Sequence, residues 1–229
     1  MVALETRSVI DALRSEMQGQ ILRGTIPAGT ALAETAVAEM FDVARPTAKA
    51  AIEQLIGAGL LRRMRNKSAR VPVLDADDVA DLYLSRAVVE SAAARILAQQ
   101  GRLPSNAVGA LERFRNAATR GNSISDLVEG DIGFHRALVA ATDSPRLRRL
   151  HDMVIGEAHL CMAQVQVHRL LDNQLVIEEH SRILAMIERK DEERAAYEMN
   201  AHVLRARNQL LAYLRRNEFD AAAAPVEDL

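Results

Sequence analysis

The chain has 229 residues, of which 49% are hydrophobic and 26% are charged, and its formal net charge is -2. Its single cysteine, Cys161, excludes an intramolecular disulfide, and no apolar run reaches the roughly 18 residues that span a bilayer. Because the N-terminus also lacks the pattern of a secretory signal, the sequence predicts a cytoplasmic protein with no membrane partner.

Charge divides the chain into two parts. Residues 1–74 carry 10 Lys and Arg against 7 Asp and Glu, while residues 75–229 carry 19 against 24. A chain of this length can form two modest domains, each with a core of its own. The opposite charges predict that the two domains bind different partners.

The first 74 residues predict a winged helix-turn-helix domain. Apolar residues recur at helical spacing over residues 4–22, and "ALAETAVAEMFDV" and "ARPTAKAAIEQLIGAGLL" predict two further short helices joined around residues 42–44. Pro46 suits the first turn of the third helix, which Gly57 and Gly59 end. "LLRRMR" and "ARVPVL" then predict two strands around the polar turn "NKS".

The remaining sequence predicts an all-α antiparallel bundle, so the expected fold class is mainly α. Pro72 breaks the last strand, and Asp75 can cap a new helix. Breaker motifs separate about six expected helices, at about 76–100, 104–119, 123–141, 144–170, 172–189 and 191–216. Residues 75–217 are therefore expected to form the second domain, and residues 218–229, which lack an apolar period, to be disordered.

Cations gather where a helix-turn-helix reads DNA. Arg45 and Lys49 lie four residues apart at the start of the third helix, with Thr47 near them. Such residues face base edges in the major groove, where arginine binds guanine through two hydrogen bonds. The hairpin adds further cations and no acidic residue, which suits phosphate contacts: Arg62, Arg63, Arg65, Lys67 and Arg70. Taken separately, these groups could also be a solvated helix face and a charged hairpin edge.

Asp131 and His135 in "DIGFH" lie one helical turn apart and share a helix face. Two ligands make a weak metal site, but His180 and His202 also lie on the apolar sides of later helices. Any one inward histidine could be a core residue with its own hydrogen bond. Four inward polar residues would each need a buried partner, and a shared divalent ion would satisfy them together.

The segment "ILRGTIPAGTALAETAVAEMFDVARPTAKAAIEQLIGAGLL" closely resembles the N-terminal winged-helix domain of GntR-superfamily transcription regulators. Those proteins typically show G-x-x-P-G, L-x-E and then V-S-R-x-x-V-R-x-A-L. The resemblance implies that Arg45 and Lys49 occupy groove-reading positions and that Arg65, Asn66 and Lys67 lie at the wing tip. Because Thr35, Lys49 and Asn66 depart from the family pattern, an operator sequence cannot be carried over from the family.

Residues 76 to about 215 resemble the FCD ligand-binding domain of FadR-type GntR regulators, through "LYLSRAVVESAAARIL", "DIGFHRALVAAT" and "EEHSRILAMIERKDEERAAYEMNAHV". In metal-binding members, the residues that match Asp131, His135, His180 and His202 are ligands, and six helices indicate the VanR-like branch. Three imidazoles and one carboxylate suit Zn²⁺ or Ni²⁺. Arg86 matches a family arginine and could contact an effector carboxylate; alternatively it pairs with Glu90, four residues on.

The sequence therefore predicts a homodimeric transcription regulator, not an enzyme, that binds a two-fold symmetric operator in double-stranded DNA and is released by a small organic acid. The alternative is a regulator for which the metal is the signal, in which Arg86 has no evident task. A metal-dependent hydrolase is a remote possibility because no H-E-x-x-H motif is present. Cys161 is expected to be a buried structural residue, and Glu129 and Glu179 to face away from the proposed ligands.

Overall fold

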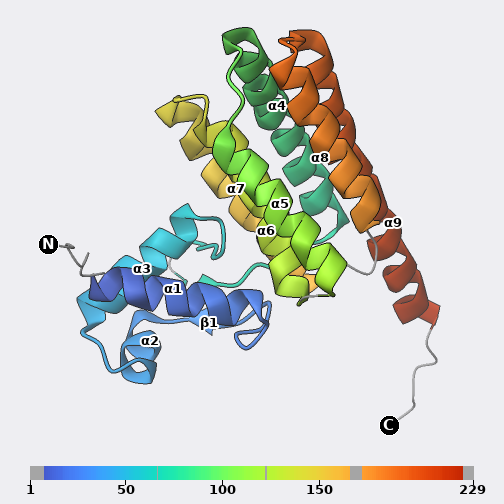
Figure 1. Ribbon diagram of the computed structural model, residues 1–229. Helices are drawn as coiled ribbons and strands as arrows, with labels where there is room; N and C mark the ends of the chain where they lie inside the picture. The colour runs from blue at the N-terminus through green and yellow to red at the C-terminus, as the bar shows by residue number, and fades with distance from the viewer. Residues whose placement is uncertain (1–7, 66, 122, 166–171, 224–229) are drawn as a thin grey trace, which may run out of the picture. The chain divides into compact units, whose positions relative to one another are not determined.

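The computed structural model describes residues 8–65, 67–121, 123–165 and 172–223 (Figure 1). The chain divides into two compact units, Met1–Val73 and Leu74–Leu229. The first contains a helix-turn-helix with a wing and the second contains helices only, so the predicted mainly-α fold class is confirmed.

Three helices make up most of the first unit: α1 (Val9–Leu22), α2 (Glu34–Met40) and α3 (Arg45–Gly57). Ser8 caps α1 by accepting a hydrogen bond from the backbone N–H of Asp11 (3.2 Å). As predicted, a proline lies in the first turn of α3. Helix α3 packs against both α1 and α2 and buries Ile52 and Leu55, which fixes the exposed start of α3 on a rigid base.

A small antiparallel sheet completes the first unit. Strand β1 (Ala31–Leu32) pairs with β2 (Ala69–Arg70), and Arg62 forms a further bridge with Arg70. The bridge between Arg62 and Arg70 is pairing within the predicted hairpin. The helix that was expected from Ala31 onward, however, begins only at Glu34. Residues 31–32 are extended because the turn through Gly29 (φ 82°) leads them alongside β2, where Val71 N donates to Thr30 O (3.0 Å).

Six described helices form the second unit: α4 (Ala76–Gln100), α5 (Ser105–Arg120), α6 (Ile124–Ala140), α7 (Pro145–Gln164), α8 (Asn173–Glu188) and α9 (Glu192–Ala223). Asp75 and Ser123 cap α4 and α6 in reciprocal capping boxes. Helix α4 packs along α9, and α5 packs along α6. The inward faces of the six helices share one apolar core that includes Leu97, Ile132, Phe134, Ile155 and Met199.

The C-terminal end of the bundle differs from the prediction. Helix α9 runs to Ala223, whereas residues 218–223 were expected to be disordered. Alanine has the highest helix propensity, and the next helix breaker is Pro225, so the run after Asp220 prolongs the helix. The rest of the expected tail, residues 224–229, and residues 166–170 of the helix expected at 144–170 lie outside the described residues.

No helix within the described ranges is long and apolar enough to cross a membrane.

Candidate metal centre and nucleic-acid face

Four polar side chains from three helices converge inside the second unit. Asp131 and His135 come from α6, His180 from α8 and His202 from α9. One nitrogen or oxygen of each lies within 4.8 Å of the others. All four residues are buried, and the most exposed of them, Asp131, is 6% exposed. The helical spacing and the fold thus bring together every residue of the predicted set.

The positions of these atoms fit a single divalent ion. His202 Nε2 lies 3.2 Å from His180 Nε2 and 3.3 Å from His135 Nε2. Asp131 Oδ1 lies 3.5 Å from His180 Nε2 and 3.9 Å from His135 Nε2. An ion at about 2.0–2.1 Å from each nitrogen spaces adjacent ligand nitrogens by about 2.9–3.4 Å. His202 Nε2 has this spacing to both of the other imidazoles.

His202 is oriented by a carboxylate that sequence reasoning expected elsewhere. Glu179 Oε2 lies 2.8 Å from His202 Nδ1, and Arg205 Nε donates to Glu179 Oε1 (2.6 Å). Burial raises the pKa of Glu179, but the hydrogen bonds from His202 and Arg205 outweigh it and bring the pKa to about 2. The expectation that Glu179 faces away is wrong: an ionised carboxylate keeps the proton on Nδ1 and leaves the Nε2 lone pair directed at the cluster.

His135 also faces a carboxylate, on α4, at close range but without the geometry of a hydrogen bond. Its Nδ1 lies 2.6 Å from Glu90 Oε2, and Arg86 Nε donates to Glu90 Oε1 (2.8 Å). The Arg86 guanidinium also lies over the Tyr83 ring, 4.9 Å from its centroid. Burial raises the pKa of Glu90, but the charges of Arg86 and His135 hold it well below the usual value. The pairing of Arg86 with Glu90, the alternative considered from the sequence, is the arrangement in the structure.

His180 is held by packing. Its ring stacks on Phe134, with 3.8 Å between ring centroids and 10° between planes, and its Nδ1 has no hydrogen-bond partner among the described residues. Burial, followed by the charges of His202 and His135, keeps the pKa of His180 well below its usual value. Burial also lowers the pKa of His202, against the opposing effect of Glu179. Neutral imidazoles are the form that binds metal ions.

The other candidate groups lie apart from this cluster. Cys161 is buried, and burial raises the pKa of its thiol to about 12, which fits the expected structural role. The side chain of Glu129 is 56% exposed and lies 3.7 Å from His159 Nε2. His151 is buried on α7 with its Nε2 3.2 Å from Glu90 Oε1. His168 lies outside the described residues.

Glu90 and Glu179 were missed as parts of the site because their partners lie 45 and 23 residues away in the sequence. Only one local signal was available for each. Glu90 follows Arg86 by one helical turn on an apolar face, and Glu179 directly precedes His180.

The start of α3 and the wing form an exposed cationic face on the first unit. Arg45 and Lys49 are exposed at the start of α3 and Thr47 is half-buried, while Arg65 and Lys67 are exposed in the wing. Arg45 and Lys67 line one hollow of about 370 Å³. Glu34 lies beside it, with its Oε2 3.4 Å from Arg45 Nε. The predicted wing residue Asn66 lies outside the described residues.

Two of the predicted wing cations are engaged with the protein itself. Arg63 forms an ion pair with Glu53, and Arg70 donates to the backbone carbonyl of Gly29. Arg63 and Arg70 are therefore less available to a partner than Lys49, Arg65 and Lys67, while Arg45 is exposed but lies 3.4 Å from Glu34.

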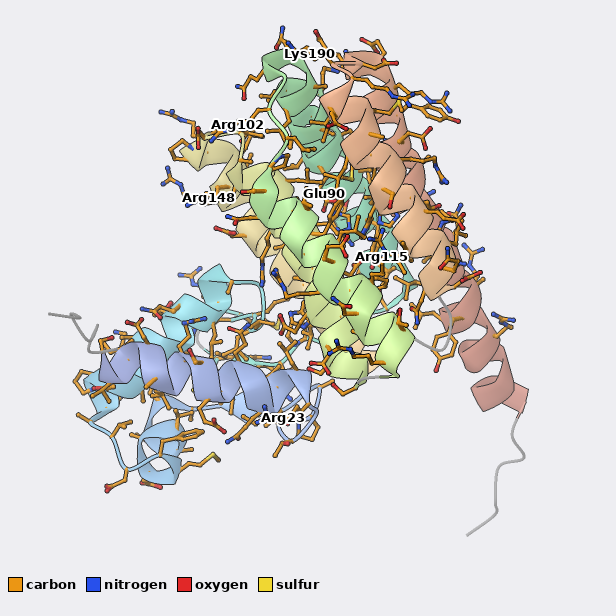
Figure 2. All side chains as sticks on the ribbon, in the orientation of Figure 1. Arg23, Glu90, Arg102, Arg115, Arg148 and Lys190 are labelled. Carbon is orange, nitrogen blue, oxygen red and sulfur yellow. The ribbon has the colours of Figure 1, made fainter. Side chains whose placement is uncertain are left out.

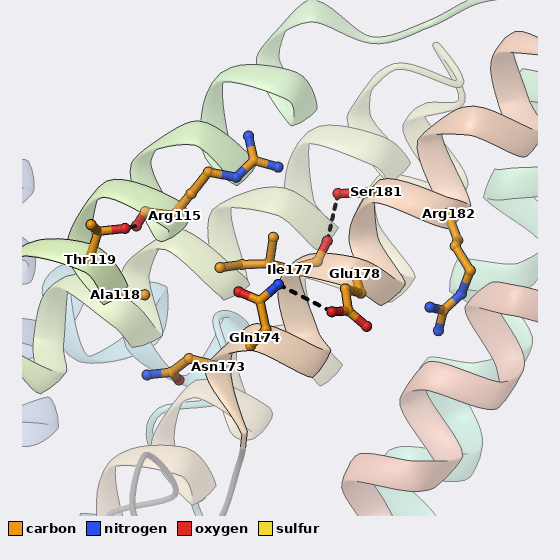
Figure 3. A pocket seen from close by; sticks show the side chains of 9 residues that line it. All are labelled: Arg115, Ala118, Thr119, Asn173, Gln174, Ile177, Glu178, Ser181 and Arg182. Atoms are coloured by element: carbon orange, nitrogen blue, oxygen red, sulfur yellow. Dashed lines mark hydrogen bonds between the residues drawn. The ribbon is translucent and has the colours of Figure 1, made fainter.

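A wide groove lies between α5 and α8, away from the cluster. Figure 3 shows its walls, with Arg115 and Thr119 on α5 and Ser181 and Arg182 on α8. Its volume is about 760 Å³. Arg115 pairs with Glu112, and Arg182 with Glu198. None of the four converging residues lines this groove, and its arginines already have carboxylate partners.

Two family models match the chain. The model for bacterial regulatory proteins of the gntR family matches residues 7–71, and the FCD domain model matches residues 81–205.

Curated relatives match most of the chain. It is 24% identical over 192 residues to the uncharacterized HTH-type transcriptional regulator YdhC of Bacillus subtilis (strain 168), covering 82% of this chain and 84% of that protein. It is 26% identical over 193 residues to the Nta operon transcriptional regulator of Aminobacter aminovorans, covering 82% and 87%. It is 24% identical over 201 residues to the "Probable D-xylose utilization operon transcriptional repressor" of Paenarthrobacter nicotinovorans, covering 87% and 88%.

Solved structures share the fold. A protein of Rhodococcus sp. RHA1 described as a transcriptional regulator GntR has a TM-score of 0.73 and 25% identity, over 90% of this chain and 98% of that one. E. coli McbR/YncC has a TM-score of 0.68 and 16% identity, over 95% and 100%. The matched families and curated relatives are transcriptional regulators and not enzymes.

Proposed function

The chain belongs to the GntR family of bacterial regulatory proteins and carries an FCD domain, and from this premise we propose a homodimeric repressor controlled through a metal-dependent effector site. DNA binding follows from the family. The metal, the effector and the sign of regulation are the proposed parts.

The convergence of Asp131, His135, His180 and His202 carries the proposal. These residues would hold a divalent ion, and three imidazoles with one carboxylate favour Zn²⁺ or Ni²⁺. The chemistry that such an ion supplies is Lewis acidity towards a ligand oxygen. The chain's own part is to exclude water from the site, to orient the three Nε2 atoms and to supply one negative charge at Asp131.

Charge in the site favours an anionic effector. Arg86 and Glu90 neutralise each other, as do Arg205 and Glu179, which leaves the Asp131 carboxylate against a divalent cation. The remaining positive charge suits a small carboxylate. Arg86 is a second candidate contact for this carboxylate, but the effector would have to compete with Glu90 for it.

For operator binding, we propose base contacts by Arg45, Thr47 and Lys49 and wing contacts by Arg65, Asn66 and Lys67. The exposure of the described cations in this set supports the assignment. A two-fold symmetric operator follows from a homodimer. Dimer formation is supported by large apolar side chains that are exposed on two helices, namely Leu84 and Val88 on α4 and Leu150 and Met153 on α7.

The six described helices of the second unit support the VanR-like branch of the FCD proteins. The description of one relative as an operon repressor supports repression.

A regulator for which the metal is the signal is the second candidate. The sequence alone disfavours it, because Arg86 has no evident task in a metal sensor. The structure gives Arg86 a task, since it holds the carboxylate that faces His135. This contact fits a metal sensor as well as a metabolite sensor.

Elemental analysis and a DNA-release titration separate these possibilities. The purified protein is expected to carry about one Zn²⁺ or Ni²⁺ per chain, and an operator selected from random DNA is expected to be released by small carboxylates at constant metal content. If the operator is released when metal is added, without any carboxylate, the result would favour the metal sensor. Protein that binds neither ion after dialysis against both would contradict either form of the proposal.

A further inference from the structure

Helix α4 supplies none of the four candidate ligands, yet it contacts one of them. The ligands lie on α6, α8 and α9. Helix α4 begins at Ala76, two residues beyond the boundary between the units, so it continues the chain from the DNA-binding unit. Its contact is Glu90, which is 1% exposed and is labelled among the helices of the second unit in Figure 2.

The Glu90 carboxylate joins three helices. Its Oε2 lies 2.6 Å from His135 Nδ1 on α6. Its Oε1 lies 3.2 Å from His151 Nε2 on α7 and accepts from Arg86 Nε on α4 itself (2.8 Å). Because the site is closed to water, these contacts are strong and movement of one partner disturbs the others.

Glu179 provides a comparison within the same site. It orients His202 from α8 and pairs with Arg205 on α9, and both helices already carry a candidate ligand. Glu179 therefore orients the His202 ring, but it does not link the metal centre to a helix that carries no ligand. Glu90 orients a ring and also connects α4.

We propose that Glu90 is the positioning residue through which occupation of the metal centre is transmitted to α4. The inference rests on the proposed function and names the helix that responds. Once His135 Nε2 is engaged, the ring cannot tilt, its Nδ1 fixes Glu90, and Glu90 fixes the middle of α4. Such outer partners set ring orientation, and their loss typically weakens metal affinity about 10–100-fold.

Hydrogen exchange of the full chain, with and without saturating Zn²⁺, tests this link. In the wild type, Zn²⁺ should slow exchange of the α6, α8 and α9 amides and also of the α4 amides around Glu90. Glu90→Gln alone would leave Arg86 buried without its carboxylate. The double variant Arg86→Met/Glu90→Met instead replaces both charges by apolar side chains of similar length.

At saturating Zn²⁺ the double variant should retain protection in α6, α8 and α9 and lose the added protection in α4. Glu179→Gln should weaken Zn²⁺ binding by about 10–100-fold and yet keep the α4 response at saturation. Glu198→Gln is the matched control: Glu198 is ion-paired with Arg182 and Arg194, and its side chain is 12% exposed against 10% for Glu179. It should change neither readout.

Two results would overturn the inference: wild-type α4 amides that do not respond while those of α6, α8 and α9 do, or a full α4 response in the double variant. Failure of the proposed function differs from both, because no helix of the wild type would then respond to Zn²⁺.

Discussion

The two units place their functional polar groups in opposite ways. In the first, Arg45, Lys49, Arg65 and Lys67 are exposed, and little of the fold depends on them. In the second, the candidate ligands are buried, and Glu90 and Glu179 bind both them and buried or half-buried arginines. Substitution of an exposed cation in the first unit should therefore alter DNA binding without changing the stability of the fold. Substitution of a buried ligand, or of a carboxylate that contacts one, should alter both metal binding and stability.

The largest effect is expected from removing a candidate ligand. His202→Ala should abolish stoichiometric metal binding, a loss beyond the roughly 10–100-fold typical of outer partners. His180→Ala should do the same. Elemental analysis after dialysis checks both, with His159→Ala as the control, since His159 is buried at 4% exposure outside the cluster. Full metal content in both ligand variants would exclude the centre.

Arg86→Ala should give the next largest effect, on stability. It leaves the buried Glu90 carboxylate without its cation, and breaking such a pair lowers the free energy of unfolding by about 3–5 kcal/mol. Denaturant unfolding of the metal-free protein measures this. Arg95→Ala, which removes the exposed pair with Glu193, should unfold like the wild type. Equal stability of the two variants would contradict the distinction between buried and exposed pairs.

Acid should act on the buried unit through His159. Burial, aided by the charge of Arg136, lowers the pKa of His159 to about 4, below the usual value near 6.5. The unfolded chain therefore takes up a proton that the folded chain does not, and stability falls as the pH drops below about 6.5. From about pH 7 to about pH 5, the metal-free wild type should lose about 2 kcal/mol more than His159→Gln. Parallel pH profiles would show that His159 titrates normally.

The smallest effect is expected at the exposed face. Arg45→Ala should weaken operator binding by about 1–3 kcal/mol if Arg45 contacts a base, and leave the unfolding midpoint unchanged. Fluorescence anisotropy with a selected operator measures the first effect and thermal unfolding the second. Arg23→Ala is the control, because Arg23 is an exposed arginine of the same unit with a long ion pair to Glu16 (3.8 Å). Unchanged operator affinity would remove Arg45 from the base-reading set.

Local patterns predicted the elements and the candidate ligands. Helical spacing located the helices, the i, i+4 pair in "DIGFH" indicated a ligand pair, and the apolar helix faces of His180 and His202 added the other two, a set that the family resemblance matched. Strand β1 was missed because two residues carry no readable period, and they are extended only through pairing with β2. Glu90 and Glu179 could not be assigned, because their roles depend on contacts between helices that no local spacing encodes.

His202 Nδ1 is hydrogen-bonded to Glu179 and His135 Nδ1 lies 2.6 Å from Glu90, whereas the His180 ring lies flat against Phe134 with no polar partner at Nδ1 among the described residues. Stacking on Phe134 opposes tilting of this ring, while no polar group at Nδ1 within the described ranges helps to set its orientation. The orientation of His180 therefore depends on the Phe134 ring and not on a hydrogen bond at Nδ1. Removing the Phe134 ring should therefore weaken metal binding through α8, the helix that carries His180.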